Sequence, residues 1–317
     1  MSNSEEQVKC LKCGTPIDQS KCPNCGKDHD FYKIGHEYCD IKNYEEAYKW
    51  YEKAAKQGNI KAQFSLALMY DIGKGVEQNN EEAVKWFQKA VEQGDALAQL
   101  NLGFMYKNDR RIKQNNEEAA KWFQKAAEQG DAVAQFNLAL MYDIGKGVEQ
   151  NYTEAVKWYE KAAEQGLLEA QYNLAFMYNK GLGIEQDNEE AAKWYEKAAE
   201  KGYAKAQYNL ALMYDIGQGV EQDYEEAIKW YEKAAEQGEA EAQYNLGVMY
   251  ANGKGVAQNY EEAVKWYKKA AEQGEAEAQY NLSVMYDQGL GVEQNDENSY
   301  KWLEQAAQNG HQKVKDM

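Results

Sequence analysis

The sequence predicts an all-α chain folded as a solenoid of eight two-helix repeats, and three of its features support this fold class. Only two prolines occur in 317 residues, which suits helices because proline disrupts their interiors. All tryptophans stand 36 residues apart, at Trp50, Trp86, Trp122, Trp158, Trp194, Trp230, Trp266 and Trp302. A glycine follows the same interval, at Gly58, Gly94, Gly130, Gly166, Gly202, Gly238, Gly274 and Gly310. A fixed interval of this length is typical of helical repeat proteins.

The repeat at residues 242–274 shows how each interval forms two helices. We expect a first helix over about 242–251 and a second over about 260–272, and call them helix A and helix B. Between them, Gly253 and Gly255 allow the positive φ angles that a tight connection needs. The spacing therefore predicts two short helices joined by a glycine loop.

The ends of helix B carry their own signals. Asn259 is a favourable N-cap, and Glu262 three residues later completes a capping box, in which each side chain binds the backbone N–H of the other residue. Gly274 ends the helix, because the residue after a helix often adopts a left-handed conformation that glycine accepts without strain. These signals predict both ends of helix B.

Helix B has one apolar face, formed in this repeat by Ala263, Trp266, Tyr267 and Ala270 at helical spacings. The alanines let a neighbouring helix approach, and the aromatic rings fill the space between helix pairs. A single pair cannot bury this face, so the repeats must stack. We therefore expect the tryptophans in the core rather than in a ligand site.

The repeat unit resembles the Sel-one-like repeat, a relative of the tetratricopeptide repeat. The matching residues read Ala-Gln-Tyr-Asn-Leu-Gly-Val-Met-Tyr at 242–250, Gly-Lys-Gly-Val at 253–256 and Glu-Glu-Ala-Val-Lys-Trp-Tyr-Lys-Lys-Ala-Ala-Glu-Gln-Gly at 261–274. The resemblance covers about residues 30–310. It implies a right-handed α/α superhelix and a role as a scaffold or adaptor for protein complexes.

The chain divides into three parts on this interpretation. Residues 1–29 form a cysteine-rich segment, residues 30–310 form the solenoid with a short first repeat, and residues 311–317 form a C-terminal tail. No complete helix follows Gly310, so we expect that end of the array either to be exposed or to pair with another copy of the chain.

Helix A is apolar on two faces, so it needs a second partner besides helix B. This second face either lines a concave groove that binds a partner or is buried against the helix A of the next repeat. Aromatic anchors dominate protein interfaces, and we take the groove as the binding surface. Its candidate residues are Phe136, Leu140, Asp143, Tyr172, Phe176, Tyr208, Leu212, Asp215, Tyr244, Val248 and Tyr280. The asparagine after each third-position side chain, as at Asn245, is expected to form an inter-helix hydrogen bond.

The charge of the chain restricts the partner. The formal net charge is −17, which repels the phosphate backbone of nucleic acid. The aspartates beside the groove favour a protein or peptide with basic and apolar side chains over a small molecule. Tetratricopeptide clamps for a C-terminal carboxylate carry lysine and asparagine where this groove is aromatic and aliphatic. The resemblance therefore does not imply binding of a carboxylate tail.

Four cysteines near the start of the chain have the spacing of a structural zinc site. Two Cys-x₂-Cys pairs, Cys10 with Cys13 and Cys22 with Cys25, are each followed by glycine. Four thiolates at this spacing can hold one tetrahedral Zn²⁺, and so small a segment needs such a staple to fold. The segment resembles a zinc ribbon. Cys39 lies outside the set and is expected to be inert.

The other function classes have less support. We expect no enzyme, since the chain holds only three histidines and no paired nucleophile. The first alternative is a regulator that contacts nucleic acid through the zinc ribbon. The second is a hydrolase with its site in the groove. The basic loop at 107–113 in the third repeat is either a solvated loop or a local contact site.

Localisation follows from what the sequence lacks. All five cysteines lie before residue 40, which is not how a disulfide-stapled secreted protein spaces them. No apolar run is long enough to cross a membrane, and no signal peptide precedes the first repeat. The expected location is therefore the cytoplasm, without a membrane partner.

Overall fold

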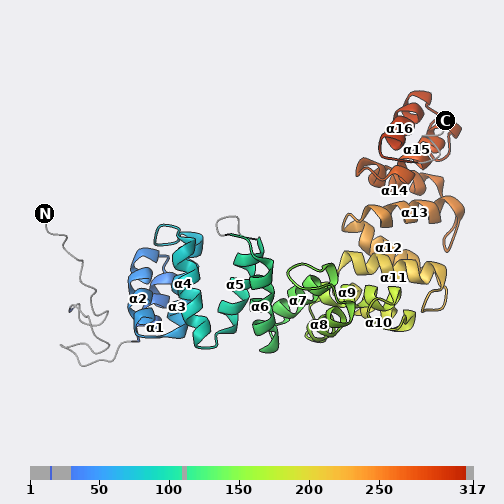
Figure 1. Ribbon diagram of the computed structural model, residues 1–317. Coiled ribbons are helices and arrows are strands. Elements are labelled where there is room, and N and C mark those ends of the chain that lie inside the picture. The colour runs from blue at the N-terminus through green and yellow to red at the C-terminus, as the bar shows by residue number, and fades with distance from the viewer. Residues whose placement is uncertain (1–14, 16–29, 109–112, 312–317) are drawn as a thin grey trace. The chain divides into compact units, whose positions relative to one another are not determined.

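The computed structural model describes residue 15, residues 30–108 and residues 113–311, and the described residues form sixteen α-helices and no strand (Figure 1). The chain divides into two compact units, Met1–Gln150 and Asn151–Met317. The first unit contains α1 (Phe31–Asp40), α2 (Tyr44–Lys56), α3 (Ile60–Ile72), α4 (Asn80–Glu92), α5 (Ala96–Asn108), α6 (Asn116–Glu128) and α7 (Ala132–Ile144).

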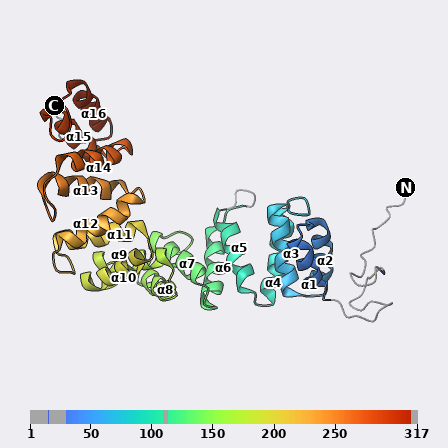
Figure 2. The same cartoon turned by 180° about the vertical axis from the view of Figure 1, so that it is seen from behind.

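The second unit contains the remaining nine helices of the described residues. They are α8 (Tyr152–Glu164), α9 (Leu168–Lys180), α10 (Asn188–Glu200), α11 (Ala204–Ile216), α12 (Tyr224–Glu236), α13 (Ala240–Asn252), α14 (Tyr260–Glu272), α15 (Ala276–Gln288) and α16 (Asp296–Gln308). Within each unit, successive helices lie side by side in both views (Figures 1 and 2).

The sixteen helices of the described residues form eight two-helix repeats, with helix A odd-numbered and helix B even-numbered. Within each unit, the closest packing is between the two helices of a repeat, as in α13 with α14, followed by the packing of helix B on the next helix A. The prediction of an all-α array of two-helix repeats is thus confirmed. Helix A begins at Ala240 rather than at 242, because the backbone N–H of Gln243 already bonds the Glu239 carbonyl at 3.1 Å.

The predicted capping box is only half right. The Asn259 side chain accepts a hydrogen bond from the Glu262 backbone N–H at 3.0 Å, as expected. The reverse bond is replaced, because the Asn259 N–H donates to the Tyr250 carbonyl at 2.9 Å and the Glu262 carboxylate binds Lys265 at 2.5 Å. The end of the loop is therefore hydrogen-bonded to helix A, and the Glu262 side chain instead pairs with a surface lysine.

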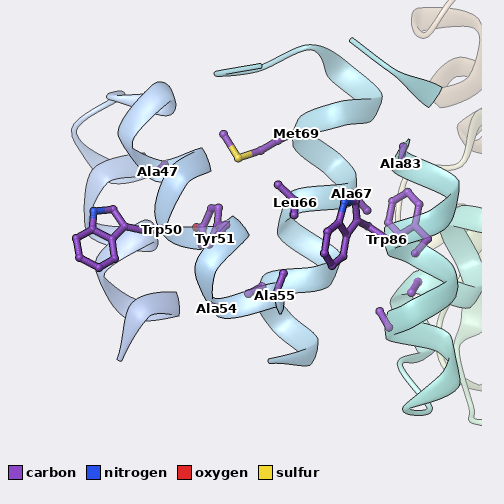
Figure 3. Packing of buried hydrophobic residues seen from close by; sticks show 14 of the residues in the cluster. Ala47, Trp50, Tyr51, Ala54, Ala55, Leu66, Ala67, Met69, Ala83 and Trp86 are labelled. Carbon is purple, nitrogen blue, oxygen red and sulfur yellow. The ribbon is translucent and has the colours of Figure 1, made fainter. Parts of the chain in front are cut away.

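The core lies between the helices of each pair and between successive pairs. Figure 3 shows Tyr51, Leu66 and Met69 between α2 and α3, flanked by small alanines. In the short first repeat, Trp50 is completely buried and its ring lies 5.3 Å from that of Phe31. The apolar face predicted for helix B is thus the face that packs.

The tryptophans differ from the prediction of a uniformly buried stripe. Trp50, Trp86 and Trp302 are buried, but the other five are only half-buried. A lysine one turn later covers the open side of the ring in the middle repeats; for example, Lys197 Nζ lies 3.6 Å from the Trp194 ring centroid. The exposed indole face is thus covered by a cation–π contact instead of by another helix.

The glycine loops pack against the preceding repeat. Gly147 has φ +78, and a Cβ atom there would overlap the carbonyl group of Asn116 at the start of α6. Gly219 has the same relation to Asn188 at the start of α10. These two loops therefore lie against the N-terminus of the previous helix B, at points where only glycine fits.

A buried glutamine near the start of helix A joins three helices. The Gln243 amide donates to the Ala235 carbonyl of the preceding helix B at 3.0 Å, and its Oε1 accepts from Gln273 at 2.9 Å. In the fifth repeat, Lys201 replaces the second glutamine, and the buried Oε1 of Gln171 has no hydrogen-bond partner among the described residues. This repeat therefore lacks a hydrogen bond that the sixth and seventh repeats form.

Replacing Lys201 by glutamine should restore that bond. We expect Lys201→Gln to stabilise the chain by about 1 kcal/mol, because a buried acceptor gains a donor. The measurement is the urea unfolding midpoint followed by circular dichroism. The matched control is Gln237→Lys, which removes the donor that lies 2.7 Å from Gln207 and should lower the midpoint. An unchanged midpoint for Lys201→Gln would contradict this account.

Candidate functional site

The second face of helix A forms a stripe of apolar side chains at its third and seventh positions, which we call the helix-A stripe. All its members are half-buried except Phe176, which is 40% exposed. Helices A of successive repeats contact each other only sparsely in the described residues, so the next helix A leaves the stripe partly open. The second unit contributes Tyr172, Phe176, Tyr208, Leu212, Tyr244, Val248 and Tyr280, and the first contributes Phe136 and Leu140.

The third-position tyrosines are also part of the core. The Tyr208 ring lies 6.0 Å from the buried Tyr231 of its own helix B, and the Tyr244 ring lies 6.1 Å from Tyr267. Burial raises the pKa of the Tyr208 hydroxyl, and a hydrogen bond with Asn245 of the next repeat lowers it. These rings therefore form the floor of the stripe, and they hold adjacent repeats together.

The fourth-position asparagine links helices, as the sequence predicts for Asn245. Its side-chain amide donates to the Tyr231 hydroxyl of the preceding helix B at 3.1 Å. In the first unit, Asn137 accepts a hydrogen bond from Lys107 of α5 at 2.7 Å. The prediction of an inter-helix bond is confirmed at these two positions.

The aspartates differ in how available they are to a partner. Asp215 is largely buried and forms an ion pair with Lys254 at 2.5 Å, so an internal cation already neutralises its charge. Asp143 is half-buried at the equivalent position of α7, in the first unit. The Asp215 carboxylate therefore attracts a basic ligand only weakly.

Four glutamates near the starts of α13 and α15 supply negative charge that the sequence analysis missed. Burial raises the pKa of Glu275, and the charges of Glu241 and Glu277 raise it further. Glu239 and Glu275 occupy N-cap positions without a side-chain capping bond. The signal was visible as Gly-Glu-Ala-Glu-Ala in two consecutive repeats. We call Glu239, Glu241, Glu275 and Glu277 the glutamate cluster.

The glutamate cluster lies beside the helix-A stripe. The charge of Glu241 raises the pKa of Tyr208, and the charges of Glu277 and Glu275 raise that of Tyr244. In both cases burial is the larger cause. The structure thus combines half-exposed aromatic rings on α11 and α13 with negative charge at the starts of α13 and α15.

The burial of Glu275, together with the charges of Glu241 and Glu277, predicts a pH effect on stability. The folded-state pKa of Glu275 lies above its ordinary 4.5, so its ionisation opposes folding at neutral pH and ceases to do so as the pH falls below 4.5. We expect Glu275→Gln to raise the urea midpoint near neutral pH and to lose this advantage in acid. Glu236→Gln, at an exposed position of α12, is the control. A pH-independent gain would argue against the raised pKa of Glu275 as the cause.

The four cysteines predicted to bind zinc, Cys10, Cys13, Cys22 and Cys25, lie outside the described residues. So do residues 109–112 of the basic loop. Cys39 is half-buried against the core of the first unit. The part of the chain that the structure describes holds no cluster of metal-binding side chains and no helix long and apolar enough to cross a membrane.

The last repeat ends in a hollow between α15 and α16. Tyr280, Val284, Tyr300 and Leu303 are among its lining residues, and Tyr300 is 73% exposed. His311 stacks on Tyr280 with ring centroids 4.3 Å apart and lies 3.0 Å from the Glu277 carboxylate. The residue after the last glycine is therefore packed into the repeat.

The helix pairs and the open stripe define a helical repeat protein of the α/α type. The model of the Sel1 repeat matches eight consecutive segments, residues 31–59, 60–95, 96–131, 132–167, 168–203, 204–239, 240–275 and 276–311. The chain therefore belongs to the Sel1 repeat family. Members of this family are generally protein-interaction scaffolds and typically not enzymes.

Among the solved structures similar to this chain are two bacterial proteins. A Sel1 repeat protein from Oxalobacter formigenes is 34% identical, with a TM-score of 0.74, over 90% of this chain and 84% of its own. A protective antigen of uropathogenic Escherichia coli strains is 38% identical, with a TM-score of 0.85. The match covers 90% of this chain but only 62% of the antigen, so this chain spans less than two thirds of that protein. No curated protein matches the chain.

Proposed function

We propose that this protein is a non-enzymatic scaffold or adaptor that binds a protein or peptide on the helix-A stripe of its second unit. The observation that carries the proposal is the position of the half-exposed stripe beside the glutamate cluster. Phe176 and Leu212 supply apolar contact area, and Tyr208 and Tyr244 supply aromatic anchors of the kind that dominate interface energies. Family membership supports the same role.

The charge of the surface favours a partner with basic and apolar side chains. Uncompensated carboxylates attract cations over a Debye length and suppress acidic partners. Within the stripe itself, Asp215 is already paired, so the glutamate cluster carries this preference. No observation favours a nucleic-acid-binding regulator or a hydrolase, and we do not propose either.

The surface can be tested without damaging the core. We expect Phe176→Ala with Leu212→Ala to lose at least about tenfold in partner capture, because exposed apolar contact is removed. Helical circular dichroism and the thermal midpoint should change little. The measurement is affinity capture from a cell extract followed by mass spectrometry and titration of the captured partner. Tyr208→Ala with Tyr244→Ala should lose both capture and stability, because these rings also pack on helix B.

The matched control is Lys229→Ala, which removes an exposed side chain from helix B of the same unit. It should capture the partner as well as the wild-type chain does. If Phe176→Ala with Leu212→Ala captures the partner normally while Lys229→Ala does not, helix B is the binding face and this proposal is wrong.

We further propose that Cys10, Cys13, Cys22 and Cys25 bind one structural Zn²⁺. The sequence supports this with two Cys-x₂-Cys pairs, each followed by glycine. Four thiolates leave no open coordination position, so the ion would stabilise the segment rather than catalyse a reaction.

Metal analysis tests the zinc site directly. The purified chain should contain about one zinc ion by mass spectrometry, because four thiolates complete one tetrahedral site. Cys10→Ser with Cys13→Ser should lose the ion, since two ligands cannot retain it. Cys39→Ser should keep it, because Cys39 packs in the first repeat. A zinc-free wild-type protein, or loss of zinc in Cys39→Ser, would exclude this assignment.

A further inference from the structure

Two lysines of the first unit occupy positions that elsewhere form an ion pair. Lys107 lies in the last turn of α5, and Lys146 lies in the loop after α7. Their equivalents three repeats later are Asp215 and Lys254, which form an ion pair at 2.5 Å. The repeat geometry therefore brings these two positions together. In the first unit both of them are cationic.

Lys146 has neither of the two side-chain partners that its equivalent, Lys254, contacts. Lys254 binds the Asp215 carboxylate and also lies 4.3 Å from the Tyr224 ring centroid. The residues at the partner positions of Lys146 are Lys107 and Asn116. Within the described residues, the Lys146 side chain has no hydrogen bond, ion pair or ring contact. Its ammonium group therefore forms no ion pair with this part of the chain.

Lys107 is half-buried and only partly satisfied. Its ammonium donates to the Asn137 amide oxygen at 2.7 Å and lies 5.9 Å from the Phe123 ring centroid. Burial lowers its pKa, and the charge of Lys146 lowers it further. Asn137 offers a neutral acceptor, and neither lysine forms an ion pair with any residue that the structure describes.

Asn116 shows that the usual hydrogen bonds at this junction are missing. Two repeats later, the amide oxygen of Asn188 accepts from Asn179 at 3.1 Å and from Gln218 at 3.2 Å. Asn179 and Gln218 are the equivalents of Lys107 and Lys146. The Asn116 amide oxygen is buried and has no partner within the described residues. The two lysines therefore do not replace the internal hydrogen bonds of the neutral junction.

We propose that Lys107 and Lys146 bind a carboxylate, supplied by an acidic side chain of a protein partner. Each carboxylate oxygen can accept from one ammonium group, as the Asp215 carboxylate does from Lys254. The net charge of −17 favours a monovalent carboxylate over a phosphate dianion, since long-range repulsion grows with ligand charge. The site lies in the first unit and does not rest on the function proposed for the second.

Acetate is the probe that tests this site on the full-length protein. Sodium acetate replaces sodium chloride at constant ionic strength, and NMR follows the ε-methylene signals of individual lysines. We expect saturating shifts at Lys107 and Lys146, and a linear, non-saturating shift over the same acetate range at the exposed Lys74. Lys74 is the matched control, because it occupies the same loop position as Lys146 and lies 4.0 Å from the Tyr44 ring centroid.

The variant Lys107→Asp restores the acid–base pair found in the sixth and seventh repeats. We expect the Lys146 signal to lose its saturating response to acetate, and the urea midpoint to rise. Linear shifts at both lysines, equal to those of Lys74, would overturn the proposal. Saturation by inorganic phosphate but not by acetate would overturn the choice of carboxylate. Retention of the acetate response at Lys146 in Lys107→Asp would show that the two lysines do not act together.

Discussion

Close packing of helices through alanine is the interaction on which the rest of this structure depends. Ala206 and Ala211 of helix A and Ala227 and Ala234 of helix B are completely buried. Larger side chains at these positions would push the helices apart, because the core is packed without spare volume. A single pair leaves an apolar face uncovered, so each repeat also depends on its neighbours.

Because the repeats pack through the same alanines, equivalent positions in different repeats have similar surroundings. A substitution at one of them changes the local chemistry while the helix pair is held by the same packing of buried alanines. Lys201 illustrates the effect in the core, where it leaves the buried oxygen of Gln171 without a partner. Lys107 illustrates it near the surface, where it faces Lys146 instead of forming the ion pair of its equivalent, Asp215. Positions where the sequence departs from the repeat therefore differ from their equivalents in hydrogen bonding or in charge.

The two units carry surfaces of opposite character. The second unit combines a half-exposed aromatic stripe with Glu275, whose ionisation is opposed by burial and by the charges of Glu241 and Glu277. The first unit holds two lysines that form no ion pair with the described residues, in a strongly acidic chain. We propose that a ligand of opposite charge compensates each of these arrangements. This is the physical basis for assigning a basic partner to one unit and an acidic group to the other.

The sequence alone determined the number of repeats, the two helices of each, and the residues that end them. Helical spacing and glycine conformation are local properties, so Asn259, Gly253 and Gly274 could be interpreted one repeat at a time. Tertiary structure decided which charges are already paired and which aromatic rings stay open. The pairing of Asp215 with Lys254 joins residues 39 positions apart, and the half-burial of Trp194 depends on what the next helix leaves uncovered. Such contacts form between repeats, so the residue pattern within one repeat does not predict them.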